Sequence, residues 1–190
     1  MQRCNAGFPF CIFEIGFGFG LTFFSFLQDF KEINGSSPLA YFAVDERLPQ
    51  SDELDSVSKI LPVDQQIAYQ EMWRKIFSVV SLTPSRAIVN ITDSITLHFI
   101  YDSVSSVIQK SDFAEQVDAW FLDGFSPSKN SEMWSEDLTL FMAKHSRSGT
   151  TLSTYSSAGA VFRVLSQAGF IVEKVKGFGK KRTMLKGIYP

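Results

Sequence analysis

The stretch that decides the fold is Cys11-Ile12-Phe13-Glu14-Ile15-Gly16-Phe17-Gly18-Phe19-Gly20. An apolar run of strand length ends near an acidic residue, and three glycines then alternate with phenylalanine. The residues that follow, 21–27, can continue as a helix. Glycine lets the backbone adopt positive φ and approach a ligand closely, and a helix start offers unpaired N–H groups. The order of strand, glycine turn and helix is typical of a nucleotide-type cofactor site, although a Gly/Phe-rich turn before a buried helix has the same pattern.

The spacing of the glycines indicates which cofactor is expected. The dinucleotide fingerprint G-x-G-x-x-G would place its third glycine at position 21, which is a leucine here, and this counts against a nicotinamide-dependent oxidoreductase. The sequence contains no G-K-[ST] motif, so an ATP site is not predicted. The pattern E-x-G-x-G-x-G resembles the first motif of the class I S-adenosylmethionine-dependent methyltransferases. The resemblance implies that Gly16, Gly18 and Gly20 wrap the methionine part of the cofactor and that Glu14 lies beneath this loop.

Composition sets the class of protein. With 190 residues, of which 45% are hydrophobic, the chain can form one domain with a sizeable core, and we expect a single domain over residues 1–190. The net charge of −2 does not indicate a generally basic surface for nucleic acid. Two cysteines are too few for a disulfide framework, which favours a reduced, cytoplasmic protein.

The sequence indicates neither a metalloprotein nor a membrane protein. His98 and His145 have no second Cys or His at ligand spacing, so no metal site is predicted. The uncharged run between Glu14 and Asp29 is shorter than the roughly 18–20 residues that a membrane-spanning helix needs. The sequence therefore predicts a soluble protein without a membrane partner.

Hydrophobic periodicity and turn residues predict alternating strands and helices. On the helix at 64–80, we expect Ile67, Trp73, Ile76 and Phe77 to share one face. This order favours an α/β fold with a mostly parallel sheet, helices on both faces and an antiparallel strand near the C-terminus. The expected strands are 11–15, 39–44, 86–91, 95–101, 117–123, 150–155, 170–176 and 183–189, and the expected helices are 21 to about 30, 52–60, 64–80, about 132–144 and 158–168.

Carboxylates stand at or near the ends of four expected strands. They are Glu14, Asp45 with Glu46, Asp102 and Asp123. In parallel sheets, ligands bind beyond the carboxyl ends of the strands. A carboxylate after the second strand can accept both ribose hydroxyls, and one after the third can accept the adenine amino group. The four strand ends are therefore candidate cofactor-binding positions.

The most specific stretch is Asp118-Ala119-Trp120-Phe121-Leu122-Asp123-Gly124-Phe125-Ser126-Pro127-Ser128-Lys129-Asn130-Ser131-Glu132-Met133-Trp134. It resembles the segment D-A-W-F-L-D-G-F-[AS]-P-[AS]-K-N-P-x-M-W of the methyltransferase half of the bacterial MnmC family. Two further pieces resemble the same family, at 154–159 and 177–185. The resemblance runs from about residue 11 to residue 188 and implies a Rossmann-like class I methyltransferase fold.

The resemblance also implies an activity. Members of the family complete 5-methylaminomethyl-2-thiouridine at the tRNA wobble position, so the implied reaction is S-adenosylmethionine-dependent N-methylation of 5-aminomethyluridine. An alkylammonium must lose a proton before it can attack the methyl group, and Asp123 is the expected acceptor. Counting along the second strand assigns the ribose acid to Asp45, whereas the family's E-x-x-P pattern assigns it to Glu46, and both assignments stay open.

Several residues are candidates for binding the tRNA anticodon loop. Aromatic side chains stack on splayed bases, Lys and Asn side chains can contact phosphates or base edges, and a basic run near the C-terminus suits the tRNA backbone. The basic run consists of Lys174, Lys176, Lys180, Lys181, Arg182 and Lys186. The candidate substrate-binding residues are Phe125, Lys129, Asn130, Trp134, Tyr155, Lys180, Lys181 and Arg182.

The chain departs from the family at several positions. Phe19 and Thr22 stand where the family has T and N in G-F-G-T-G-L-N, Phe162 replaces an arginine, and Thr183 replaces the glutamate of K-R-E-M-L. The family's segment before the glycine loop and its flavin-dependent oxidase half are not in this sequence, so an oxidase is expected as a fused or separate partner. A non-catalytic relative that kept the fold and a methyltransferase for another amine are the alternatives.

Overall fold

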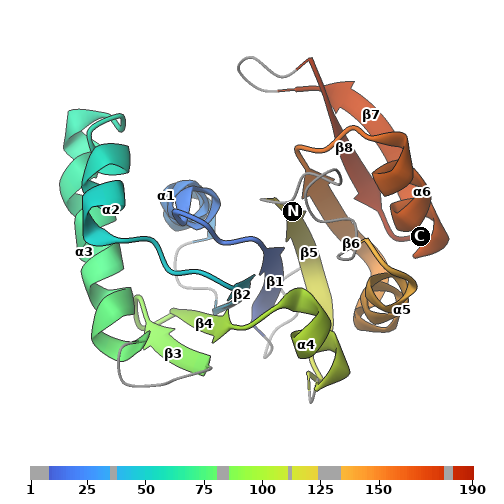
Figure 1. The fold of residues 1–190 in the computed structure, drawn as a ribbon, viewed down its shortest axis with the longest axis horizontal. Coiled ribbons are helices and arrows are strands. Elements are labelled where there is room, and N and C mark those ends of the chain that lie inside the picture. The colour runs from blue at the N-terminus through green and yellow to red at the C-terminus, as the bar shows by residue number, and fades with distance from the viewer. Residues whose placement is uncertain (1–8, 35–37, 81–85, 111–112, 124–133, 178–181) are drawn as a thin grey trace. The chain divides into compact units, whose positions relative to one another are not determined.

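The computed structural model describes residues 9–34, 38–80, 86–110, 113–123, 134–177 and 182–190 (Figure 1). Strands and helices alternate along this part of the chain. Their bounds are β1 (Phe10–Ile15), α1 (Leu21–Asn34), β2 (Leu39–Asp45), α2 (Ser51–Ser58), α3 (Val63–Val80), β3 (Arg86–Asn90), β4 (Ile95–Tyr101), α4 (Val104–Gln109), β5 (Val117–Leu122), α5 (Glu136–His145), β6 (Ser146–Thr154), α6 (Gly159–Gln167), β7 (Ile171–Lys176) and β8 (Thr183–Ile188).

The chain divides into two compact units. The first unit comprises Met1–Phe10 and Phe17–Asp102, and the second comprises Cys11–Gly16 and Ser103–Pro190. The first unit therefore holds most of the glycine loop, and the second holds nearly all of β1. The single domain expected from the sequence stays a prediction.

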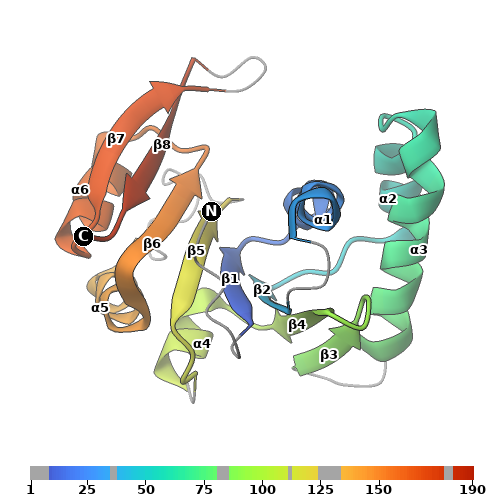
Figure 2. The same cartoon turned by 180° about the vertical axis from the view of Figure 1, so that it is seen from behind.

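In the first unit the strand order is β3-β4-β2. β2 runs parallel to β4, with Leu39 opposite Ile95 and Asp45 opposite Tyr101, and β3 pairs antiparallel with β4. The predicted hairpin of these last two strands is confirmed. From Leu39 to Val44 every residue of β2 is buried, as a central parallel strand requires. α2 and α3 pack side by side, and α3 packs against β3 (Figures 1 and 2).

In the second unit the strand order is β1-β5-β6-β8-β7. β1, β5 and β6 run parallel, whereas β8 is antiparallel to both of its neighbours. α6 packs against β7 and α5 (Figure 2). The predicted antiparallel pairing near the C-terminus is confirmed.

Three local predictions need correction. Ile67 is 69% exposed, whereas Trp73 and Ile76 of the same helix are buried, so Ile67 does not share their face. The short helix α4 was not predicted, and it begins where the Ser103 side chain accepts the Ser106 N–H at 3.1 Å. β6 begins at Ser146, four residues earlier than predicted, because an irregularity in its pairing extends the strand.

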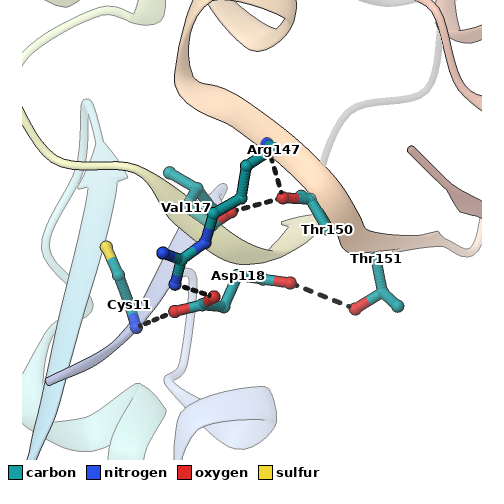
Figure 3. A network of polar contacts seen from close by, with 6 residues as sticks. All are labelled: Cys11, Val117, Asp118, Arg147, Thr150 and Thr151. Atoms are coloured by element: carbon teal, nitrogen blue, oxygen red, sulfur yellow. Dashed lines mark hydrogen bonds and ion pairs between the residues drawn. The ribbon is translucent and has the colours of Figure 1, made fainter. Parts of the chain in front are cut away.

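Figure 3 shows the polar network at this irregularity. Between Val117 and Ala119 of β5, the partner residue on β6 jumps from Ser146 to Thr151. Gly149 takes a φ of 86° within the extra residues. The Thr150 hydroxyl donates to the Val117 carbonyl at 2.6 Å and accepts the Arg147 N–H at 3.0 Å. The extra backbone polar groups are therefore satisfied inside the sheet.

Asp118 links this irregularity to β1. Its side chain is buried, accepts the Cys11 N–H at 2.9 Å and pairs with the Arg147 guanidinium (Figure 3). A buried carboxylate needs such partners because desolvation is costly. Burial, with the Asp118 carboxylate adding to it, raises the pKa of the Cys11 thiol, so this thiol stays neutral.

We expect Asp118→Ala to lower the free energy of unfolding by about 3 kcal/mol, because the Arg147 charge and the Cys11 N–H lose their acceptor. Urea unfolding followed by circular dichroism measures the change. Glu71→Ala removes an exposed carboxylate from α3 and should change stability by no more than about 0.5 kcal/mol. Equal stability of Asp118→Ala and wild type would show that the network is not a stability determinant.

Candidate active site

Parallel pairing brings the strand-end carboxylates to a common edge within each unit. In the second unit Glu14 lies opposite Phe121 and Ile15 opposite Leu122, so Asp123 follows at the same end of the strands. In the first unit the pairing of Asp45 with Tyr101 places Asp102 one residue further along. Glu14 is fully buried, whereas Asp45, Asp102 and Asp123 are half-buried. The structure thus groups the acids as Glu14 with Asp123, and Asp45 and Glu46 with Asp102.

The glycine loop uses positive φ at all three glycines, with 87° at Gly16, 52° at Gly18 and 66° at Gly20. At Gly18 an added Cβ would meet nothing within 4 Å, so the backbone is open to a ligand. At Gly20 a Cβ would lie 3.0 Å from the Phe17 ring, so a side chain there would disturb the packing. The open approach at Gly18, whose N–H is bonded to the Asp45 carboxylate, leaves space for a ligand beside an acidic side chain.

Asp45 connects the glycine loop to the end of β2. One carboxylate oxygen accepts the Gly18 N–H at 2.7 Å, and the other accepts the Arg47 N–H at 3.0 Å. The Arg47 guanidinium in turn donates twice to Glu53, at 2.8 and 2.9 Å, which fixes the segment between β2 and α2. Glu46, the neighbouring acid, is exposed to solvent. Both candidate ribose acids lie at this strand end, but only Asp45 is shown contacting the loop.

The loop is also held from α3 by two residues that sequence reasoning missed. The Tyr69 hydroxyl donates to the Phe19 carbonyl oxygen at 2.7 Å, and the Trp73 indole N–H donates to the same oxygen at 3.1 Å. Trp73 was predicted only as an apolar core residue. No local pattern at these positions points to a loop 50 residues earlier in the chain.

Asp123 lies at the end of β5 beside the end of β6. Its carboxylate accepts the Tyr155 backbone N–H at 3.1 Å. The Thr154 hydroxyl donates to the Leu122 carbonyl at 2.7 Å and accepts the Ser156 N–H at 3.1 Å, which joins the two strand ends. Burial raises the pKa of the Asp123 carboxyl, and the Tyr155 N–H opposes the rise. A carboxylate with a raised pKa is a better proton acceptor than an ordinary aspartate.

The predicted substrate-binding residues are either exposed, buried, or outside the described part of the chain. Tyr155 is 45% exposed next to Asp123, so its ring is accessible. Trp134 is only 9% exposed, so little of its indole is available for stacking on a base. Arg182 is exposed, and its carbonyl accepts the Gly177 N–H at 3.2 Å. The predicted residues outside the described part of the chain are Phe125, Lys129, Asn130, Lys180 and Lys181.

The described residues provide neither a metal-binding cluster nor a membrane-spanning helix. Within them, no group of three or more His, Cys, Asp or Glu side chains is placed to hold a metal ion. None of the helices α1 to α6, in the part of the chain that the structure covers, combines the length and apolarity needed to cross a bilayer.

Comparison with known proteins gives consistent matches. A family model described as S-adenosyl-L-methionine-dependent methyltransferase matches residues 66–190. The tRNA 5-methylaminomethyl-2-thiouridine biosynthesis bifunctional protein MnmC of Vibrio cholerae serotype O1 is 38% identical over 94% of this chain. The chain spans only 27% of that relative's length.

Solved structures show the same fold. The crystal structure of MNMC2 from Aquifex aeolicus superposes with a TM-score of 0.74 at 22% identity, over 96% of this chain and 54% of that one. The glycopeptide N-methyltransferase MtfA complexed with S-adenosylmethionine gives a TM-score of 0.50 at 12% identity, over 98% of this chain and 90% of that one. The predicted Rossmann-like methyltransferase fold is confirmed.

We expect Asp45→Ala to speed amide hydrogen exchange at Gly18 roughly tenfold, because the N–H loses a charged acceptor. Nuclear magnetic resonance of the free protein measures this rate without any ligand. Glu46→Ala is the matched control, since the neighbouring carboxylate is exposed, and should leave the Gly18 rate unchanged. Equal rates in Asp45→Ala and wild type would contradict the contact between this carboxylate and the loop.

Proposed function

Because the chain belongs to the S-adenosyl-L-methionine-dependent methyltransferase family, we propose that it N-methylates 5-aminomethyluridine, or its 2-thio form, at the tRNA wobble position. The observation that carries the proposal is the open glycine loop whose Gly18 N–H is held by Asp45 at the end of β2. The name of the Vibrio cholerae relative, which refers to tRNA 5-methylaminomethyl-2-thiouridine biosynthesis, supports the choice of substrate. tRNA modification also favours a cytoplasmic location.

The cofactor roles divide among the strand ends and the loop. We propose that Gly16, Gly18 and Gly20 surround the methionine part of S-adenosylmethionine. Asp45 already accepts two backbone N–H groups, so we assign it to hold the loop and assign the exposed Glu46 to the ribose hydroxyls. Asp102, which follows β4, would accept the adenine amino group. The bound cofactor supplies a sulfonium-activated methyl group.

Asp123 is proposed as the proton acceptor. In the transfer, a bond forms between the substrate nitrogen and the methyl carbon while the carbon–sulfur bond breaks. The alkylammonium form of the substrate has no lone pair, so one proton must first leave the nitrogen, and Asp123 would take it. The raised pKa of this carboxyl suits that role, and the Tyr155 N–H fixes the orientation of the carboxylate. Placement of the two reactants supplies the rest of the catalysis.

Recognition of tRNA is proposed for the neighbourhood of Asp123 and the C-terminal hairpin. The exposed Tyr155 ring can stack on an unpaired base, and Arg182, Lys174 and Lys176 are exposed cations suited to phosphates. Lys186 is less available because it pairs with Glu173 at 2.9 Å. The roles of Phe125, Lys129, Asn130, Lys180 and Lys181 stay predictions. A flavin-dependent oxidase, fused or separate, is proposed as a partner because the relative is bifunctional.

We expect Asp123→Asn to retain cofactor binding but to reduce methyl transfer at least about a hundredfold, because it removes the proton acceptor without changing the side chain's size. Calorimetry with S-adenosylmethionine measures binding. Transfer of labelled methyl groups to tRNA from cells that lack the methylation measures activity. In wild type, the rate should fall as the pH falls through the raised Asp123 pKa, because only the carboxylate accepts a proton.

The outcomes separate the alternatives. A wild-type chain that does not bind S-adenosylmethionine would be a non-catalytic relative. A chain that binds it but does not methylate tRNA would act on another amine. Equal activity of Asp123→Asn and wild type would remove Asp123 from the mechanism.

We expect Arg182→Ala to weaken tRNA binding and to reduce the slope of log affinity against log salt concentration by about 1, as the loss of one phosphate contact requires. Filter binding across a salt series measures both quantities. Lys59→Ala, at an exposed position that follows α2 in the first unit, is the charge-matched control and should leave the slope unchanged. An unchanged slope in Arg182→Ala would exclude this side chain from phosphate contact.

A further inference from the structure

Two side chains of α3 converge on one carbonyl of the glycine loop. Tyr69 and Trp73 are four residues apart, so they lie on the same face of the helix. Both are buried, with exposed fractions of 0% and 2%. Their donors reach the Phe19 oxygen at 2.7 and 3.1 Å, so both lone pairs of this half-buried acceptor are used.

The peptide group between Phe19 and Gly20 is bonded on both sides. Its carbonyl faces α3, and the Gly20 N–H donates to the Phe17 carbonyl at 2.8 Å. On its C-terminal side this peptide is followed by Gly20, whose φ of 66° needs no side chain to be accommodated, so the glycine by itself restricts the orientation of the peptide little. Its orientation is therefore fixed by α3 on the carbonyl side and by the Phe17 carbonyl on the N–H side.

The donors are themselves held by aromatic packing. The Trp73 ring lies 5.7 Å from the Phe17 ring and 5.3 Å from the Phe77 ring, measured between centroids. The Tyr69 ring lies edge-on to Phe24 at 5.4 Å. Burial raises the pKa of Tyr69 to about 12, so its hydroxyl stays a proton donor at neutral pH. The two hydrogen bonds are thus supplied by pre-ordered side chains.

We propose that Tyr69 and Trp73 are positioning residues for S-adenosylmethionine, acting through the Phe19 carbonyl without touching the cofactor. This inference rests on the proposed function. With the Phe19 oxygen bonded to α3, this oxygen is kept from facing the anionic methionine carboxylate of the cofactor. A rotated peptide would instead present an oxygen of like partial charge and weaken the site. The affinity for the cofactor is therefore set partly by α3.

The test uses Tyr69→Phe, which removes only the hydroxyl, and Trp73→Phe, which removes the indole N–H. We expect each to raise the S-adenosylmethionine dissociation constant roughly tenfold in calorimetry, since the loop amides lose their fixed orientation. In the free protein, the carbon-13 chemical shift of the Phe19 carbonyl should change in both variants. Transfer rate at saturating cofactor should change little, because the reacting atoms are untouched.

Thr150→Val is the matched control. It also removes a buried hydroxyl that donates to a main-chain carbonyl, the Val117 carbonyl at 2.6 Å, but it belongs to the second unit and contacts neither Tyr69 nor Trp73. We expect it to lower the melting temperature without changing the dissociation constant. If Trp73→Phe does not fold, Tyr69→Phe alone decides the question.

The outcomes distinguish this inference from the proposed function. Wild-type protein that fails to bind S-adenosylmethionine would overturn both. Wild-type binding with an unchanged dissociation constant in folded Tyr69→Phe would overturn the positioning role alone. An increase in the dissociation constant that Thr150→Val reproduces would assign the effect to stability and would likewise overturn it.

Discussion

Parallel hydrogen bonding between neighbouring strands is the constraint on which the arrangement of acids depends. Because β1 and β5 run in the same direction, Glu14 and Asp123 come to one edge of their unit, and the pairing of β2 with β4 does the same for Asp45 and Asp102. A shift of one residue in either register would turn each side chain to the other face of its sheet. The chemistry therefore depends on a backbone ladder whose buried residues are almost all apolar.

Local patterns were sufficient to predict most elements and the glycine loop. The apolar run of β2, the hairpin of β3 and β4, and the three glycines are all signalled within a few residues of sequence. Long-range effects were not predictable in this way. Tyr69 reaches a carbonyl 50 positions earlier. The polar start of β6 pairs with Val117, more than twenty-five residues earlier, and Gly149 and Thr150 exchange backbone hydrogen bonds with Tyr189 near the C-terminus.

In the candidate site, too, local features were predictable from sequence and long-range contacts were not. The acidic strand ends and Asp123 could be predicted from sequence, because strand-end acids and a long family motif are visible in one dimension. The choice between Asp45 and Glu46 could not, since the two are adjacent and chemically alike. The structure separates them by what each carboxylate contacts: Asp45 holds the loop amide of Gly18, whereas Glu46 faces solvent. The hydrogen bond that distinguishes the two carboxylates joins residues 27 positions apart, which spacing along the chain does not reveal.

The second unit is discontinuous in sequence, so its two segments leave the ribosome at different times. The segment Cys11–Gly16 is made early, yet its partner strand β5 begins at Val117, and the Cys11 N–H bonds to an aspartate 107 residues later. Residues 17–102 are made before β5, so the side of this apolar segment that pairs with β5 is the last to find its partner. Until β5 is made, that one edge of the strand is open to pairing with other chains. Nascent-chain aggregation, and the protection that chaperones give against it, should therefore centre on residues 11–15.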